Sequence, residues 1–238
     1  MISLIKKGTI LLLMKLFYFL IIIFLIFPLC GCLRPLRPSQ EQLNRQLLDA
    51  ASDGSVEDVK RLLLMGADIN TKNANNEYGS TPFKLAIISN NYLVVEYFLQ
   101  NGQDPNDYRG GGVTPLMSAA ANGDIELLKL LLRYGADPDY PAPGGNTALM
   151  SATSHTEIFK ILLDHKANIN ARDGYGRTVL IWAAYHGTEE VVTLLCKMGA
   201  DPEIKDKGGN TALSAAKKKG RSRIVELLEN CSRNKTPN

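Results

Sequence analysis

A short motif recurs along this chain of 238 residues at a nearly constant spacing, and it restricts the possible folds more than any other feature. Each copy opens with a threonine and closes with a Gly-Ala-Asp triplet or a close variant of it. The opening threonines are Thr81, Thr114, Thr147, Thr178 and Thr211, at spacings of 33, 33, 31 and 33 residues. The closing triplets begin at Gly66, Gly102, Gly135, Lys166 and Gly199. Because Gly66 precedes the first of these threonines, the segment before it supplies one further copy.

The residues within one copy predict two short antiparallel helices. Thr114 can cap a helix with its hydroxyl, and Pro115 suits the first helical position, where its missing N–H is not needed. Gly123 allows a tight reversal, and the leucine run that follows gives a second helix an apolar face. Gly135 suits the left-handed residue that ends a helix. Such a hairpin is too small to bury its own leucines, so the copies must stack on one another.

A 33-residue period with a Thr-Pro-Leu opening and a Gly-Ala-Asp close resembles the ankyrin-repeat family. The resemblance covers roughly 190 of the 238 residues. It implies an all-α ankyrin-repeat solenoid of about six helix-turn-helix units with short β-turn fingers, and a concave face that binds other proteins. The repeat domain is expected over 41–231, with units at about 41–70, 71–106, 107–139, 140–170, 171–203 and 204–231. A disordered tail is expected at 232–238.

The N-terminal 31 residues are of a different kind and predict an export signal. Residues 16–29 are apolar without interruption, but fourteen residues are fewer than the roughly 20 that a spanning helix needs. The sequence Leu29-Cys30-Gly31-Cys32 that follows looks like the bacterial lipoprotein box, which implies cleavage before Cys32 and attachment of a fatty acyl group such as palmitate to its thiol. The alternative is an uncleaved single-pass anchor over residues 10–29, with Lys15 reaching the headgroups.

Either N-terminal arrangement tethers the repeats to a membrane on the exported side. Residues 32–40 contain Pro35 and Pro38 and are expected to be an extended linker. We therefore expect a membrane-anchored protein of the cell envelope, either a periplasmic or an outer-membrane lipoprotein. After Cys32 the chain carries 24 basic and 24 acidic residues, because three of its 27 basic residues precede that cysteine. A neutral mature chain argues against general nucleic-acid binding.

No constellation of residues predicts enzymatic chemistry, a metal site or a cofactor. The histidines His155, His165 and His186 are scattered, and no Cys or His pair has zinc-ligand spacing. The glycine clusters before the repeat threonines follow no strand, so a phosphate-binding loop is not expected. The aspartates that close the repeats, such as Asp137, are expected to accept hydrogen bonds from the turn backbone.

Three local departures from the repeat pattern carry further expectations. Unit four is two residues short, so its first helix should be shortened or its turn tightened, and Lys166 should adopt a left-handed conformation at a cost of about 1 kcal/mol. Cys196 is expected to be a buried thiol, with a Cys196–Cys231 disulfide as the less favoured alternative. The basic residues 217–223 are interpreted as the hydrophilic face of a terminal unit rather than as a patch for an acidic partner or phosphate.

The candidate binding residues follow from the register of the repeats. The fourth residue after each threonine should face the groove, and these positions, with the equivalent of unit one, are Asp49, Leu85, Ser118, Ser151, Trp182 and Ala215. Exposed Trp, Tyr and Arg are typical of interface hot spots. The candidates therefore are Trp182, the only tryptophan, with Tyr185, His186, Tyr175, Arg177, Tyr140, Tyr108 and Arg109. The alternative is that Trp182 fills the gap left by the short helix of unit four.

The resulting functional expectation is a monomeric, non-enzymatic scaffold or regulator that binds another protein in the bacterial cell envelope. Two alternatives remain open at this stage. One is a secreted or surface-displayed effector that engages host proteins, and the other is an inhibitor or guard of an envelope enzyme. If Trp182 belongs to the interface, Trp182→Ala should weaken partner capture about tenfold and leave thermal unfolding nearly unchanged.

Overall fold

The computed structural model describes residues 38–73, 79–107, 112–152 and 155–233. The chain divides into two compact units, Met1–Gln42 and Leu43–Asn238. The described residues contain twelve helices and no strand. The helices are α2 (Gln40–Asp53), α3 (Val56–Leu64), α4 (Pro82–Ile88), α5 (Tyr92–Gln100), α6 (Pro115–Asn122), α7 (Ile125–Arg133), α8 (Ala148–Ser151), α9 (Thr156–Asp164), α10 (Val179–His186), α11 (Glu189–Lys197), α12 (Ala212–Lys218) and α13 (Ser222–Arg233).

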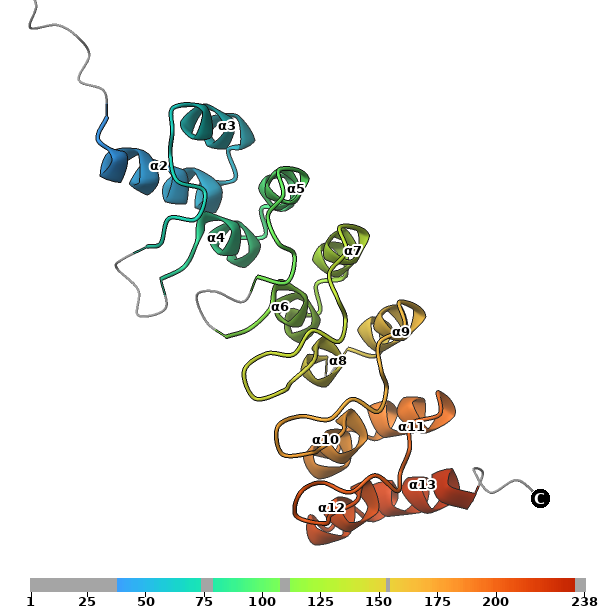
Figure 1. Ribbon diagram of the computed structural model, residues 1–238. Coiled ribbons are helices and arrows are strands. Elements are labelled where there is room, and N and C mark those ends of the chain that lie inside the picture. Colours follow the sequence, from blue (N-terminus) through green and yellow to red (C-terminus); the bar gives the residue numbers. More distant parts are fainter. Residues whose placement is uncertain (1–37, 74–78, 108–111, 153–154, 234–238) are drawn as a thin grey trace, which may run out of the picture. The chain divides into compact units, whose positions relative to one another are not determined.

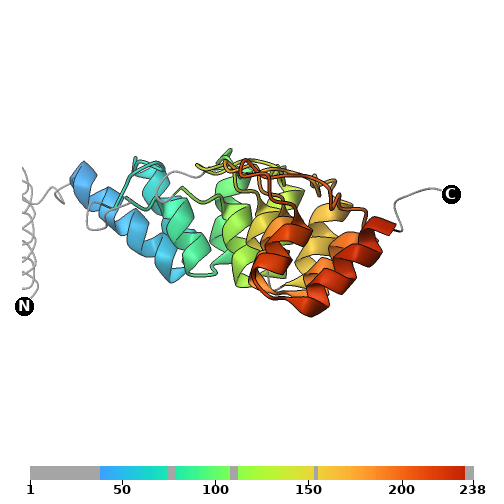
Figure 2. The ribbon, with the colours of Figure 1, turned by 90° about the horizontal axis from the view of Figure 1, so that it is seen from below.

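Within Leu43–Asn238 the helices form successive hairpins that stack in sequence order (Figure 1). The first helix of each hairpin packs against the first helices of its neighbours: α6 contacts α8, and α10 contacts α12. The second helices pack against one another in the same way, since α11 contacts both α9 and α13. Figure 2 shows the long connections between C-terminal hairpins gathered along one side of the helices. This serial stacking confirms the helical solenoid expected from the repeat. We call the first helices from α4 to α12, with the connections that precede them, the inner face.

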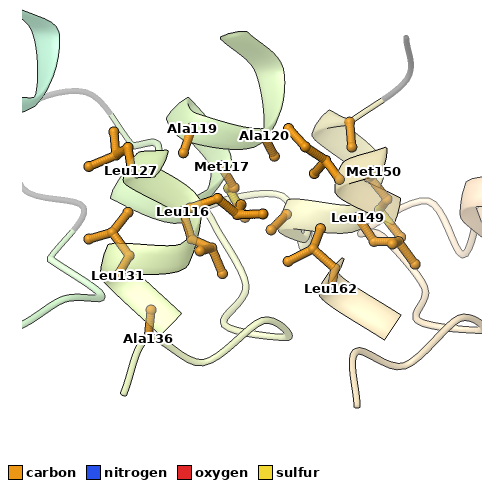
Figure 3. Packing of buried hydrophobic residues seen from close by; sticks show 14 of the residues in the cluster. Leu116, Met117, Ala119, Ala120, Leu127, Leu131, Ala136, Leu149, Met150 and Leu162 are labelled. Carbon is orange, nitrogen blue, oxygen red and sulfur yellow. The ribbon is translucent and has the colours of Figure 1, made fainter. Parts of the chain in front are cut away.

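The core runs through the stack because each hairpin buries its apolar residues against the next one (Figure 3). In unit three, Leu116 and Met117 of α6 and Leu131 of α7 are buried, and they lie beside Leu149 of α8. Ala119 and Ala120 are also buried, and small side chains at these positions let neighbouring helices approach closely. The leucines that one hairpin cannot bury alone are therefore covered by its neighbours.

Threonine hydroxyls cap the first helices as the motif predicts. The side chains of Thr81, Thr114, Thr178 and Thr211 accept hydrogen bonds from the backbone N–H three residues further on. Each of these bonds satisfies a donor that the helix itself leaves unpaired, which is worth about 1 kcal/mol.

Unit four departs from this pattern in three ways. Helix α8 has only four residues, whereas α6 and α10 have eight each. The hydroxyl of Thr147 makes no capping bond, and within the described residues it is a buried oxygen without a hydrogen-bond partner. Lys166 has φ = 65°, the left-handed conformation expected for the residue that replaces the terminal glycine. The two-residue deletion has therefore shortened the first helix, as predicted.

The aspartates that close the repeats organise the turns. Carboxylate oxygens of Asp68, Asp104, Asp137 and Asp201 each accept a hydrogen bond from the N–H two residues further on. Neighbouring units are joined at the same place, since Asn106 Oδ1 accepts from Asp137 N and Asn170 Oδ1 from Asp201 N. These contacts confirm the structural role predicted for the aspartates.

The connections of units four, five and six are hydrogen-bonded to one another. Gly174 N donates to Gly144 O at 2.6 Å, and Lys207 N donates to Tyr175 O at 2.8 Å. A Cβ on Gly145 would lie 2.7 Å from Gly174 N, and Gly145 has φ = 78°. The glycine cluster of unit four is thus needed for backbone packing between fingers.

Cys196 and Cys231 form a disulfide, with their Cα atoms 5.6 Å apart. The favoured expectation of a buried thiol at Cys196 was therefore wrong, and the alternative pairing is the one observed. The bond joins α11 to α13, two second helices that already contact each other. Sequence spacing could not establish this, because the pairing depends on how the last two hairpins approach each other.

Helix α13 continues two residues past Cys231, through Ser232 to Arg233. The predicted signal peptide, the predicted lipidation site Cys32 and most of the predicted linker lie outside the described residues. At the start of the described chain, Ser39 and Gln42 form reciprocal backbone-to-side-chain hydrogen bonds, which cap α2. No helix from residue 38 onwards, among those described, has the length and apolar character needed to span a bilayer.

Candidate functional site

The predicted aromatic residues of unit five form one cluster on α10 and the connection before it. The Trp182 ring stacks on the His186 ring, with centroids 5.2 Å apart and planes 3° from parallel. Tyr185 meets the same imidazole edge-on at 5.3 Å. The Arg177 guanidinium lies 4.0 Å from the centroid of Trp182 and 4.6 Å from that of Tyr175. The structure therefore brings together five of the eight candidate residues.

A buried aspartate holds this cluster in place. The side chain of Asp173 is 1% exposed and forms an ion pair with Arg177 Nε at 2.8 Å. It also accepts hydrogen bonds from Trp182 Nε1 at 3.1 Å and from the backbone N–H groups of Tyr175 and Arg177, both at 2.9 Å. Burial raises the pKa of Asp173, but these hydrogen bonds outweigh it and leave the pKa below its usual value. Asp173 is thus a charged anchor for the side chains around it.

Trp182 is fixed by its neighbours but remains partly exposed. His186, one helical turn after Trp182, stacks on the indole ring. Arg177, which precedes α10, also lies over the indole, so Trp182 is contacted by residues on both sides of it in the sequence. The indole N–H is already bonded to Asp173. The expectation that Trp182→Ala leaves unfolding nearly unchanged therefore has to be revised, because the change removes a donor from a buried carboxylate.

Tyr185 extends the cluster towards unit six. It is 42% exposed, and the Lys219 ammonium lies 4.1 Å from the centroid of its ring. A hydrogen bond with Lys219 and the charge of that ammonium, with smaller effects from Lys218 and Arg177, hold the pKa of Tyr185 below its usual value. The aromatic cluster therefore continues directly into the basic run of α12.

Two hollows open beside Trp182, and this residue lines both. The larger one, about 650 Å³, lies among α6, α8 and α10, where Met117, Met150 and His186 contribute to its walls. The smaller one, about 190 Å³, lies between α10 and α12, with Ile181, Tyr185, Ala215 and Lys218 among its lining residues. The short helix α8 of unit four borders the larger hollow. Because α8 is only four residues long, it leaves that side of unit five uncovered.

The other predicted positions are distributed more widely. Tyr140 is half-buried in the connection after α7 and lines neither hollow. Tyr108 and Arg109 lie outside the described residues. Of the six groove positions, Ser151, Trp182 and Ala215 line the hollows, Leu85 and Ser118 are half-buried elsewhere on the inner face, and Asp49 is exposed.

Sequence reasoning missed Asp173, Lys218 and Lys219 as members of the site. Asp173 lies five residues before Thr178, and Asp206 lies five before Thr211 with its own bonds to Gly208 N and Asn210 N. That repeated spacing was the available signal for Asp173. The lysines were recognised only as part of a charged terminal unit, because their proximity to Tyr185 depends on how α12 packs against α10.

The arrangement presents aromatic and cationic groups but no catalytic geometry. Across the described ranges no group of three or more His, Cys, Asp or Glu side chains could hold a metal ion. Asp173, the most buried carboxylate of the cluster, already has its oxygens engaged by four donor groups. A preformed surface of this composition is suited to contact with another macromolecule.

Comparison with known proteins identifies the repeats. A family model described as ankyrin repeats (3 copies) matches residues 47–142, 116–206 and 173–236. The ankyrin repeat protein YahD of Escherichia coli (strain K12) is 31% identical over 198 residues, covering 80% of this chain and 97% of YahD. The crystal structure of an ankyrin repeat domain from Acinetobacter baumannii AYE superimposes with a TM-score of 0.68 at 30% identity, covering 78% of this chain and 97% of that one.

Some other similarities cover only a short segment of a longer protein. The palmitoyltransferase AKR1 of Lachancea kluyveri is 40% identical over 70 residues, which is 29% of this chain and 10% of the yeast enzyme. The chain thus spans about a tenth of the length of that relative. The match covers part of the repeat region of this chain, and ankyrin repeats are in general non-enzymatic binding scaffolds.

Proposed function

Because the chain belongs to the ankyrin-repeat family, we propose that it is a membrane-tethered module that binds one protein partner through the inner face of unit five. Ankyrin repeats are protein–protein interaction modules, and the proposal concerns where this one binds and where it acts. The observation that carries it is the cluster around Trp182, which is exposed at Tyr185, His186 and Tyr175 and yet held in one arrangement by Asp173.

Such a cluster favours binding because little conformational entropy is lost when a partner arrives. Side chains that are already ordered do not have to be immobilised at the interface, which otherwise costs about 0.5–1.5 kcal/mol for each flexible side chain. Trp, Tyr and Arg are also the residues enriched among interface hot spots. Units one and two also bring a cation to a ring, since Lys60 lies over Tyr97, but that ring packs against Phe98, which is fully buried and belongs to the core.

For the cellular location we propose the exported side of a bacterial membrane, with the chain attached through a lipid on Cys32. The lipoprotein-like sequence around Cys32 supports this, and the uncleaved anchor over residues 10–29 is the competing arrangement. The Cys196–Cys231 disulfide offers independent support, because such bonds form and persist mainly in exported proteins. The partner would then be another protein of the cell envelope.

Affinity capture with the full-length tagged protein in detergent tests the binding surface. The variant Tyr185→Ala removes an exposed ring of the cluster, and recovery of the specific partner should fall about tenfold. The matched control is Tyr92→Ala on α5, a second helix, where the tyrosine is 37% exposed. Equal recovery by the two variants would place the interface elsewhere.

Metabolic labelling with palmitate tests the tether. Label should enter the wild-type protein and be absent from Cys32→Ala, whereas an uncleaved anchor predicts no label in either protein and retention of residues 1–31. Protease treatment of intact cells then separates the two exported locations, because a surface-displayed effector is digested and a periplasmic protein is protected.

A further inference from the structure

The formal charges of units five and six are divided between their two sides. The inner-face segments 171–187 and 204–221 contain eight basic residues against the two acidic residues Asp173 and Asp206. The basic residues are Arg172, Arg177, Lys205, Lys207, Lys217, Lys218, Lys219 and Arg221. The outer segments 188–203 and 222–233 contain three basic and six acidic residues. The neutrality of the mature chain therefore conceals a strongly basic inner face at one end of the stack.

Some of these cations already have partners, and two beside the aromatic cluster have no carboxylate. Arg177 is paired with Asp173 at 2.8 Å, and Lys217 lies 3.6 Å from Glu229. Lys218 lines the smaller hollow and Lys219 lies over the ring of Tyr185, and neither forms an ion pair within the described part of the chain. Both are exposed. They are the cations best placed to meet an anionic group.

The hydrophilic-face interpretation of this lysine run does not account for its position. A terminal unit needs polar residues on the side that has no neighbour. Lys218 and Lys219 are instead close to residues of unit five, Lys219 to the Tyr185 ring and Lys218 to the hollow that Arg177 and Ile181 also line. Their charges are therefore directed at the inner face.

The size of the smaller hollow limits what can enter it. Its volume of about 190 Å³ is below the range of about 300–1,000 Å³ that is usual for small-molecule sites. Ile181 and Ala215 are both buried and give it an apolar floor, while Tyr185 and Trp182 contribute aromatic walls. Its polar lining consists of two cations, one carboxylate and one amide, from Arg177, Lys218, Asp206 and Asn210. A space of this size and character fits one apolar side chain.

We propose, on the basis of the function proposed above, that this surface binds an acidic segment of a partner protein. One apolar side chain of the segment, of leucine or phenylalanine size, enters the hollow between α10 and α12. Carboxylates on either side of it lie beside Lys218 and Lys219. The charge complementarity sets the partner's chemistry, and the hollow sets the position of the segment.

A protein segment fits these features better than a nucleic acid does. Phosphate recognition over an extended strand needs a basic groove that tracks the backbone. Here the described inner-face segments of units three and four, residues 104–107, 112–123, 138–152 and 155, contain three acidic residues and no lysine or arginine. The basic region of units five and six therefore does not continue into units three and four, and it lies next to a pocket for a single side chain.

Fluorescence anisotropy with the full-length protein in an uncharged detergent tests the proposal. The probe is a fluorescein-labelled nine-residue peptide with four glutamates on each side of one phenylalanine. Matched probes replace the glutamates with glutamine or the phenylalanine with alanine, and a single-stranded RNA of nine nucleotides is the third comparison. The acidic phenylalanine peptide should bind at least tenfold more tightly than the glutamine peptide and several-fold more tightly than the alanine peptide.

Charge-reversal variants test whether the peptide is attracted by Lys218 and Lys219 in particular or only by the net charge of the protein. Lys218→Glu with Lys219→Glu should weaken binding of the acidic peptide at least tenfold and reduce its salt dependence. The matched control, Lys129→Glu with Lys197→Glu, makes the same change in net charge at exposed positions on α7 and α11 and should leave the affinity unchanged. Thermal melts of both double variants confirm that each is folded.

Each of four outcomes would overturn the proposal. These are absence of binding by the acidic peptide, equal affinity for the glutamine peptide, equal weakening by the two double variants, or tighter binding of the RNA. Equal affinity for the alanine peptide would remove the assigned role of the hollow. If one of these is found while Tyr185→Ala still loses its native partner, the proposed function stands and only the acidic chemistry of the partner is wrong.

Discussion

Units four and five are neighbours in the stack, yet they differ in the length and capping of their first helix and in the residue that follows their second helix. Helix α10 has eight residues and is capped by the Thr178 hydroxyl, whereas α8 has four residues and the equivalent Thr147 hydroxyl makes no bond. The left-handed residue after the second helix is Gly199 in unit five, with φ = 87°, and Lys166 in unit four, with φ = 65°. The larger hollow lies beside both the short α8 and α10, so the irregular repeat borders the open side of Trp182 and His186, which the regular repeat carries.

The largest effect on stability is expected from the disulfide that links units five and six. It closes a loop with a sequence separation of 35 residues, for which chain entropy predicts about 4 kcal/mol of stabilisation. Replacing both Cys196 and Cys231 with serine should therefore lower the melting temperature and make units five and six the first to unfold. Hydrogen exchange resolved by repeat measures this. A wild-type protein that melts identically with and without reductant would contradict it.

The buried carboxylate of unit five gives the next largest effect. Asp173→Ala removes the acceptor for Arg177, Trp182 and Tyr175 and should destabilise the protein by about 3 kcal/mol. The matched control is Asp206→Ala, because Asp206 holds the equivalent connection in unit six but is more exposed. Chemical denaturation measures both variants. Equal losses would show that burial of Asp173 is not the deciding factor.

The pH dependence of stability tests whether the charge of the Asp173 carboxylate stabilises the fold, or only its shape. The folded pKa of Asp173 lies below its ordinary value of 3.8, so its stabilising contribution is present above that pH and is lost as the pH falls below it. Asp173→Asn should therefore reduce the slope of stability against pH in the acid range, while the slope near neutral pH stays the same. An unchanged acid slope would mean that other carboxylates dominate acid unfolding.

A pair of threonine substitutions tests the difference in capping directly. Thr178→Val removes a hydroxyl that accepts from Ile181 N and should cost about 1 kcal/mol. Thr147→Val removes a buried hydroxyl that has no partner in the described structure, and it should be neutral or slightly stabilising. Thermal unfolding of the two variants makes the comparison. A similar loss in both would show that the Thr147 hydroxyl is satisfied in solution.

The left-handed residue that ends unit four gives the smallest expected effect. Lys166→Gly relieves a conformation that side chains rarely adopt and should stabilise the protein by about 0.5–1 kcal/mol. Gly199→Lys, the reverse change at the equivalent position of unit five, should destabilise it by a similar amount. Melting temperatures that move in the same direction for both variants would contradict this account.

Much of the fold could be predicted because its determinants are local and repeated. The threonine caps, the shortened helix of unit four and the left-handed conformation of Lys166 all follow from residue types at fixed positions in the period. Part of the candidate site could be predicted too, because Trp182, Tyr185 and His186 share one helix and Tyr175 and Arg177 share the preceding turn. Tyr140 was included because it lies on a neighbouring turn, and it lines neither hollow.

The remaining features depend on distances between units, which the repeat period does not specify. The sequence by itself determined that six helical hairpins stack, because a 33-residue period makes each hairpin bury the next one's leucines. Only the tertiary structure decided that Cys196 reaches Cys231, that Asp173 anchors Trp182, and that Lys219 lies over Tyr185. Those contacts depend on how closely and at what angle neighbouring elements pack, and side-chain packing sets both.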